Sequence, residues 1–115
     1  MPNKGRAGED AAASYLEEKG IKILEKNFRS RMGEIDIVAL DGETLIFVEV
    51  KAWSFYGIDA LEHAINAKKR HKIIETSKYF LSLHREYRYM TVRFDVMLIS
   101  PGGFTHLASA FTELV

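Results

Sequence analysis

Apolar side chains recur along this chain with two periods, one typical of helices and one typical of strands. Residues 7–19 and 66–84 carry them at helical spacing, with Gly20 as a stop signal and Asn66 as a candidate N-cap. Strands are predicted where side chains alternate or are rich in β-branched types, over 21–28, 34–40, 44–51, 91–99 and, as a short last strand, 104–110. Residues 58–65 fit a short helix or a loop equally well. The predicted order is α-β-β-β-α-β-(β), an α/β fold with a mixed sheet flanked by two helices.

Composition narrows the class of protein. The chain has 115 residues, 47% of them hydrophobic and 28% charged, which predicts one globular domain over residues 1–115. It has no cysteine, which excludes disulfide scaffolds, thiolate zinc sites and thiol nucleophiles. No apolar run approaches the roughly 20 residues that span a bilayer, and the N-terminus lacks the apolar core of a signal peptide. We therefore expect a cytoplasmic protein without a membrane partner.

The charges are sorted along the chain. The net charge is +0, which taken alone argues against a nucleic-acid partner. However, residues 1–65 hold 8 basic and 12 acidic side chains, residues 66–93 hold 8 basic and 2 acidic, and residues 94–115 hold 2 acidic. An acidic site in the first segment and a basic surface in the second would together give this balance.

Two predicted strands carry charges where apolar residues would be expected. Glu49 and Lys51 follow the most apolar run of the chain, and residues two apart on a strand share a face. Glu34 and Asp36 share a face of the preceding strand in the same way. The hairpin between the strands has an Asp-Gly turn signal, and its register decides which of these residues meet.

Two registers are consistent with the turn. A two-residue loop at 41–42 places Asp36 opposite Phe47 and Glu34 opposite Glu49, whereas a four-residue loop at 41–44 places Asp36 opposite Glu49. Either register brings two or three carboxylates and Lys51 onto one small patch.

Carboxylates this close repel one another, and a divalent cation would offset the repulsion. Oxygen ligands select Mg²⁺ or Mn²⁺ over zinc. Such a metal supports hydrolysis of a phosphodiester, with Lys51 orienting or deprotonating the attacking water or stabilising the oxyanion. The alternative interpretation is a surface hairpin with a cross-strand Glu–Lys ladder, and the residues alone leave both open.

Four motifs, in order and in spacing, resemble a known family. They are Gly5-Arg6-Ala7-Gly8-Glu9, Gly33-Glu34-Ile35-Asp36-Ile37-Val38-Ala39, Phe47-Val48-Glu49-Val50-Lys51 and Arg93-Phe94-Asp95-Val96. This pattern resembles the bacterial UPF0102 (YraN-like) family, which is similar to the archaeal Holliday-junction resolvases within the PD-(D/E)XK nuclease superfamily. The resemblance implies a restriction-endonuclease-like fold and a metal-dependent DNA endonuclease.

The resemblance also implies a role for individual residues. Asp36 and Glu49 would ligate the metal, the Val50 carbonyl would be a third contact, and Glu9 would complete the site. Lys51 would be the catalytic lysine, beside Asp36 and Glu49 as catalytic residues.

Further residues are expected around this site. Glu34 is expected to lie in the outer coordination shell of the metal or to be the ion-pair partner of Arg29, Arg31 or Arg93. Arg93 and Asp95 are interpreted as a buried salt bridge that orients the site, with direct catalysis as the alternative.

Candidate contacts to nucleic acid lie on two segments. Lys69 and Lys72 belong to the basic run 68–72 of the second helix, and Arg29 and Arg31 lie just before the Asp36 strand. Arg6, in the first motif, is a further candidate. A solvated basic helix face is the alternative interpretation of residues 68–72.

The sequence departs from the family pattern at two places. Trp53 lies where an arginine is expected, and it would stack on an unpaired base or lie partly buried or in a dimer interface. Thr76 and Ser77 replace an expected alanine pair, a change interpreted as affecting packing only. The four histidines have no metal-ligand spacing and are interpreted as surface or helix-face residues.

The favoured hypothesis is a Mg²⁺- or Mn²⁺-dependent endonuclease acting on DNA, with branched DNA as a candidate substrate and a homodimer expected if that substrate is a symmetric junction. One alternative is a non-catalytic nucleic-acid-binding or assembly module on a nuclease scaffold. Another is an oligomerisation domain without a nucleic-acid partner.

Overall fold

The fold follows the predicted order of helices and strands. The computed structural model describes residues 4–52, 65–100 and 102–112, and the side chains among them except those of residues 4–7 and 100. The elements are α1 (Lys4–Glu18), β1 (Lys22–Arg29), β2 (Glu34–Asp41), β3 (Thr44–Ala52), α3 (Ala67–Leu83), a 3₁₀ turn (Arg85–Tyr87), β4 (Thr91–Ser100) and β5 (Gly103–Phe111). The prediction of an α/β fold in the order α-β-β-β-α-β-β is confirmed. Residues 58–64, for which the sequence fits a helix or a loop, lie outside the described residues.

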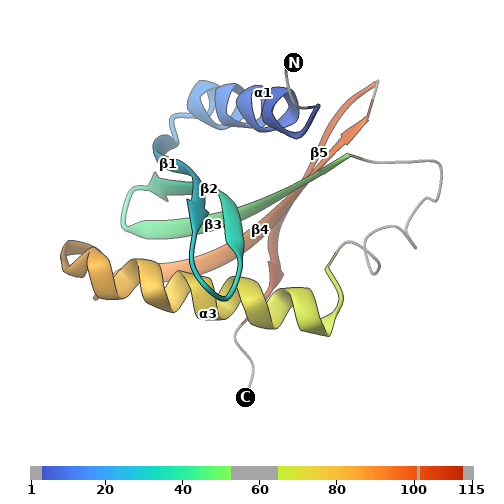
Figure 1. Ribbon diagram of the computed structural model, residues 1–115. Coiled ribbons are helices and arrows are strands. Elements are labelled where there is room, and N and C mark those ends of the chain that lie inside the picture. Colours follow the sequence, from blue (N-terminus) through green and yellow to red (C-terminus); the bar gives the residue numbers. More distant parts are fainter. Residues whose placement is uncertain (1–3, 53–64, 101, 113–115) are drawn as a thin grey trace.

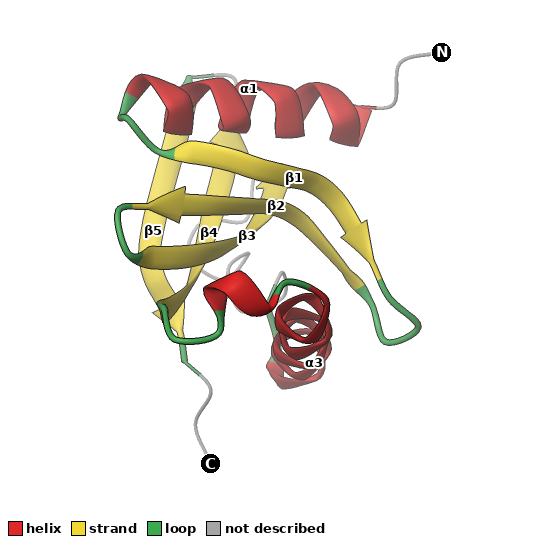
Figure 2. Ribbon diagram, turned by 90° about the vertical axis from the view of Figure 1, so that its left-hand side faces the viewer, coloured by secondary structure: helices red, strands yellow, loops and turns green. Residues whose placement is uncertain are grey.

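The five strands form one mixed sheet in the order β1-β2-β3-β4-β5. Every neighbouring pair is antiparallel except β3 and β4, which are parallel. A parallel pair requires a crossover connection, and α3 lies on the path between these two strands. The helices cover opposite faces of the sheet, as Figures 1 and 2 show.

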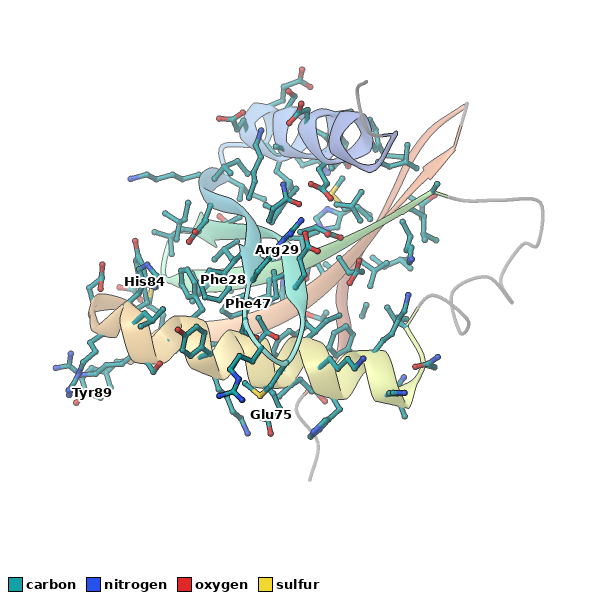
Figure 3. All side chains as sticks on the ribbon, in the orientation of Figure 1. Phe28, Arg29, Phe47, Glu75, His84 and Tyr89 are labelled. Atoms are coloured by element: carbon teal, nitrogen blue, oxygen red, sulfur yellow. The ribbon has the colours of Figure 1, made fainter. Side chains whose placement is uncertain are left out.

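Each helix packs on its own set of apolar side chains. Ala12, Ala13 and Leu16 of α1 are buried in one cluster with β2, β3 and β4 residues such as Ile46. On the other face, Ile73 and Phe80 of α3 are buried in a larger cluster. The Phe80 ring lies edge-on to Phe28 and Phe47 with centroids 5.1 and 5.7 Å away, and Figure 3 shows these two side chains between the sheet and α3. The two-period pattern of the sequence therefore corresponds to two separate cores.

Local signals define the element ends. The Asn66 side chain accepts a hydrogen bond from the Lys69 amide at 3.0 Å, which confirms the predicted N-cap of α3. Gly20 follows α1 with φ of +84°, a conformation that favours glycine.

The β2–β3 turn selects one of the two expected registers. Asp41 pairs with Thr44, so the chain reverses through Gly42, whose φ is +59°, and Glu43. Extending this register places Asp36 opposite Glu49, the second of the two expected registers, but the loop that gives it has two residues at 42–43 and not the four expected at 41–44. Because register decides which side chains share a face, this turn is the first determinant of the candidate site.

Within the described part of the chain, neither helix has the length and apolar composition required to cross a membrane.

Candidate functional site

A bend in β1 and β2 determines where the acidic side chains point. Asn27 has φ of +56°, which interrupts the alternation of β1. Before the bend, Lys26 reaches α1 and forms an ion pair with Asp10 at 2.9 Å. After it, Phe28, two residues further on, lies in the core beneath α3. The register places Asn27 across from Asp36. Asp36 therefore lies at the point where the side chains of β1 change from facing α1 to facing α3.

The strands β2 and β3 stop pairing at the same level. Their last paired residues are Ile37 and Val48. Beyond this pair a side chain replaces the backbone as the hydrogen-bond acceptor: Asp36 Oδ2 accepts a hydrogen bond from the Val50 amide at 2.7 Å. A backbone amide is therefore bonded to a side chain at the point where the two strands separate, which holds Asp36 at a fixed orientation.

Three carboxylates from two elements meet at this point. Oxygen atoms of Glu9 from α1 and of Glu34 and Asp36 from β2 lie within 4.8 Å of one another. Asp36 is only 9% exposed, so this charge is largely removed from water. Glu34 therefore lies in the carboxylate group itself, and it also faces Arg29, whose Nε is 3.7 Å from Glu34 Oε1.

Glu49 adds a fourth carboxylate, next to Asp36. Burial, and after it the hydrogen bond and the charge of the neighbouring Glu49, together raise the pKa of Asp36 from its ordinary 3.8 to about 8, against the opposing effect of the Val50 amide. Burial and the nearby Asp36 likewise raise the pKa of Glu9. In the metal-free protein Asp36 is consequently mostly protonated at neutral pH and hydrogen-bonded to Glu49.

Asn27 is a site residue that the sequence reasoning missed. Its side chain hydrogen-bonds Glu9 and so partly offsets the rise in the pKa of that carboxyl. Asparagine is enriched among residues with positive φ, but an isolated Asn within a strand pattern does not by itself indicate a bend. Asn27 therefore both bends β1 and holds the Glu9 side chain next to this strand.

Two lysines border the carboxylates. Lys69 of α3 lies within hydrogen-bonding reach of Lys51 of β3, and burial followed by this like charge lowers the pKa of Lys69, while Glu49 and Asp36 act in the opposite direction. The contact joins the strand that carries Glu49 to the first turn of α3. The predicted catalytic lysine therefore has a second ammonium group beside it.

The group has the donor chemistry of a site for a hard divalent cation. Glu9, Glu34, Asp36 and Glu49 offer only oxygen atoms, which suits Mg²⁺ or Mn²⁺. Within the described residues the bonded partners of Asp36 are the Val50 amide and the carboxyl groups of Glu9 and Glu49, so its ionised form lacks a bonded cation there. A divalent cation fits this set because it would stabilise the ionised form that burial disfavours. The amide of Val50 is bonded to Asp36, and a role for its carbonyl as a ligand stays a prediction.

The candidate nucleic-acid contacts lie on both sides of this group. Lys72 and Arg31 are exposed, and Arg29 is exposed and paired with Glu34 as one of the expected alternatives. The side chain of Arg6 and the whole of Trp53 lie outside the described residues.

Arg93 and Asp95 form the expected ion pair at some distance along the sheet from the carboxylates. Arg93 Nε and one terminal guanidinium nitrogen each lie 2.9 Å from an Asp95 oxygen. Asp95 is fully buried, and it also bonds His106 Nε2 at 2.7 Å and accepts from the Ser109 amide at 2.9 Å. Burial would raise the pKa of Asp95, but these hydrogen bonds outweigh it and hold the pKa below its ordinary value.

This second cluster ties β4 to β5. The register pairs Asp95 with Val48, which packs against α1, so its side chain lies on the opposite face from that of Glu49. An orienting effect on the metal site would therefore have to pass through β3 or through α1, which carries Glu9 and whose Tyr15 lies edge-on to His106. The interpretation of His106 as a surface residue was wrong: it is 11% exposed and bonded to a buried carboxylate.

The fold and the site define an α/β protein in which a cluster of carboxylates, with Asp36 buried, and two lysines lie between two helices. The cluster lies at the point where strands β2 and β3 stop pairing. The family model described as "Uncharacterised protein family UPF0102" matches residues 8–99. A UPF0102 protein from Persephonella marina is 44% identical over 108 residues, covering 94% of this chain and 92% of that protein. One from Treponema denticola is 41% identical, covering 98% of each chain, and one from Thermodesulfovibrio yellowstonii is 42% identical, covering 93% and 94%. The chain belongs to the UPF0102 family.

Proposed function

We propose that the protein is a Mg²⁺- or Mn²⁺-dependent endonuclease that hydrolyses phosphodiester bonds of DNA. The observation that carries the proposal is the convergence of four carboxylates and two lysines at the point where β2 and β3 separate. A surface Glu–Lys ladder would leave its charges in water, whereas Asp36 is only 9% exposed. Burying an acidic group beside other carboxylates is costly, and cation binding supplies a reason for it.

The proposed roles follow from the position of each side chain. Asp36 and Glu49, with Glu9 and Glu34 at the rim, would hold the cation. A bound divalent cation supplies Lewis-acid chemistry, because it neutralises charge that develops on phosphate oxygens. Lys51 would orient or deprotonate the attacking water, or stabilise the oxyanion. Lys69, beside Lys51, would hold a phosphate oxygen and so reduce the repulsion between the two ammonium groups.

Charge sorting supports a nucleic-acid substrate. Metal binding would neutralise part of the acidic segment and leave the basic side chains of residues 66–93 unopposed. DNA affinity would then increase when the metal is bound. We propose branched DNA as the substrate class to test first, and for a symmetric four-way junction a homodimer would supply the two active sites.

A cleavage panel tests the proposal. Fluorescent linear, flapped and four-way DNA would be incubated with Mg²⁺ or Mn²⁺ at about pH 8.5, where Asp36 is largely ionised. Asp36→Ala is the test variant, and Asp10→Asn is a matched control, because Asp10 is an exposed acid beside Glu9 in sequence that pairs with Lys26 instead. We expect metal-dependent cleavage by the wild type and the control, and none by Asp36→Ala.

The alternatives give different results in the same panel. A binding or assembly module on the same scaffold predicts salt-sensitive DNA binding that survives Glu49→Ala and needs no metal. An oligomerisation domain predicts no DNA binding even at low salt. No cleavage of any substrate, or cleavage unchanged in Asp36→Ala, would refute the enzymatic proposal.

A further inference from the structure

The turn between β1 and β2 is seated on α3. Figure 1 shows this turn reaching across the helix. Ser30 Oγ lies 3.1 Å from Thr76 Oγ1, on the buried side of α3. Thr76 has no exposed surface and Ser30 is half-buried, so the contact between the hairpin and the helix is partly shielded from water.

The hydroxyl groups at this contact form a directed chain. Thr76 Oγ1 donates to the Lys72 carbonyl at 2.7 Å, which uses its only proton. Ser30 must therefore donate to Thr76, since the alternative acceptor, the Gly33 carbonyl, is further away at 3.4 Å. The Met32 amide in turn donates to Ser30 Oγ at 3.0 Å. Three linked hydrogen bonds thus run from the tip of the hairpin to the backbone of α3, and linked bonds polarise and strengthen one another.

Gly33 permits the close approach. A β-carbon at this position would lie 3.3 Å from Lys72 Cβ and 3.4 Å from Thr76 Oγ1, tighter than ordinary contact. The glycine is therefore explained by its distance to the helix. The same contact places the turn that carries Arg31 directly against Lys72.

Resting on the proposed function, we propose that Ser30 and Thr76 are positioning residues that hold Arg31 and Lys72 on a single nucleic-acid-binding surface. The two cations lie far apart in the sequence, which presents them as separate candidates. The hydrogen-bonded contact joins their segments, so one phosphate backbone meets both. An alanine at position 76 could not make this contact, so the threonine has a role beyond packing.

The physical benefit is effective concentration. If two cationic side chains lie on segments that move independently, each phosphate contact costs the conformational entropy of ordering its own segment. If one segment is fixed on the other, the second phosphate contact forms intramolecularly. Loosening the hairpin should therefore cost one or more phosphate contacts without removing any cation. Each lost contact lowers the slope of log affinity against log salt by about 0.9.

The test uses full-length protein variants that keep every charge. Thr76→Val removes the hydroxyl at nearly constant volume, and Ser30→Ala removes its partner. Thr76→Ser retains the hydroxyl and is the conservative variant. Ser77→Ala is the matched control, because Ser77 is also buried in α3 and donates to the Ile74 carbonyl at 2.6 Å without touching the hairpin. Binding to fluorescent DNA would be measured in EDTA over a salt series, which separates binding from cleavage. Hydrogen exchange of the amides of residues 30–33 would report on the hairpin.

We expect Thr76→Val and Ser30→Ala to weaken DNA binding about three-fold or more, to reduce the salt slope by about 0.9 and to speed amide exchange in the hairpin. Thr76→Ser and Ser77→Ala should both keep the wild-type DNA affinity, salt slope and amide exchange. Faster exchange with unchanged affinity and slope would overturn the inference, as would weaker binding with unchanged exchange. If the wild type binds DNA but does not cleave it with metal present, the proposed function is contradicted, and the variants still test whether Ser30 and Thr76 position the DNA-binding surface. A wild type that binds no DNA in EDTA and cleaves none in Mg²⁺ or Mn²⁺ would refute both.

Discussion

Replacing Asp36 with asparagine should stabilise the metal-free protein at alkaline pH and abolish its response to a divalent cation. Asparagine reproduces the protonated form of this side chain. Its carbonyl oxygen can accept the Val50 amide bond that Asp36 Oδ2 accepts at 2.7 Å, and its amide can donate to Glu49. The substitution therefore removes a buried charge while keeping the hydrogen bonds.

The size of the effect follows from linkage between folding and protonation. The pKa of Asp36 is about 8 in the folded protein against an ordinary 3.8, so the folded state binds the proton more tightly. Stability contributed by this proton is present at low pH and is lost as pH rises from about 4 to about 8. At about 1.4 kcal/mol for each pH unit between the two values, the upper bound is about 6 kcal/mol. Solvent entry and side-chain relaxation reduce it, so we expect at least about 2 kcal/mol.

Thermal unfolding in EDTA over a pH series measures this effect. The difference between the two proteins isolates Asp36, because the other groups titrate in both. We expect similar midpoints at or below about pH 4 and a midpoint higher by about 8 °C for Asp36→Asn near about pH 9, at about 4 °C per kcal/mol for a chain of this size. Added Mg²⁺ or Mn²⁺ should raise the midpoint of the wild type and of Asp10→Asn, but not that of Asp36→Asn.

Either of two results would refute this reasoning. One is an Asp36→Asn midpoint at or below that of the wild type at alkaline pH, which would mean that the buried carboxylate has a cationic partner in solution. The other is a metal-induced rise of equal size in both proteins, which would place the cation elsewhere.

Three further predictions concern neighbouring positions. Asp95→Ala should cost about 3–5 kcal/mol in urea unfolding, because it leaves Arg93 and His106 at a buried site without their carboxylate, yet the remaining folded protein should still respond to metal; an unchanged unfolding midpoint would contradict this. Lys69→Gln should leave the unfolding midpoint within about 2 °C and slow cleavage at saturating metal by about ten-fold or more, and full activity would exclude a phosphate contact there. Asn27→Ala should be less stable than Asn27→Gly by about 1 kcal/mol, because only glycine adopts a φ of +56° without strain, and equal stabilities would show that the bend relaxes.

Much of the fold could be predicted from local signals. The N-cap at Asn66 and the turn at Gly42 act over a few residues, so composition and spacing indicate them. Strand alternation and a hairpin near Gly42 were enough to predict that Asp36 lies opposite Glu49 as one of two registers, although the loop itself is at 42–43 and not at 41–44.

Other features depend on contacts between segments far apart in the sequence. The position of Lys69 beside Lys51 requires the crossover to bring the first turn of α3 next to the end of β3. The backbone conformation of Asn27 accompanies a contact with each helix, because Lys26 pairs with Asp10 of α1 while Phe28, two residues on, packs beneath α3. The burial of His106 follows from Asp95 across the β4–β5 pair. A single sequence carries no short-range signal for these arrangements.

The two outer strands share a feature with a consequence for self-association. Among the described residues, Asn27 in β1 and Ser109 in β5 are the non-glycine positions with positive φ, and each lies on an edge strand. A sheet grows by adding a strand to a long, flat edge, and a left-handed residue breaks the row of free amides and carbonyls that a further strand would need. Both borders are therefore protected against edge-to-edge aggregation, which disfavours a dimer that forms by pairing of edge strands.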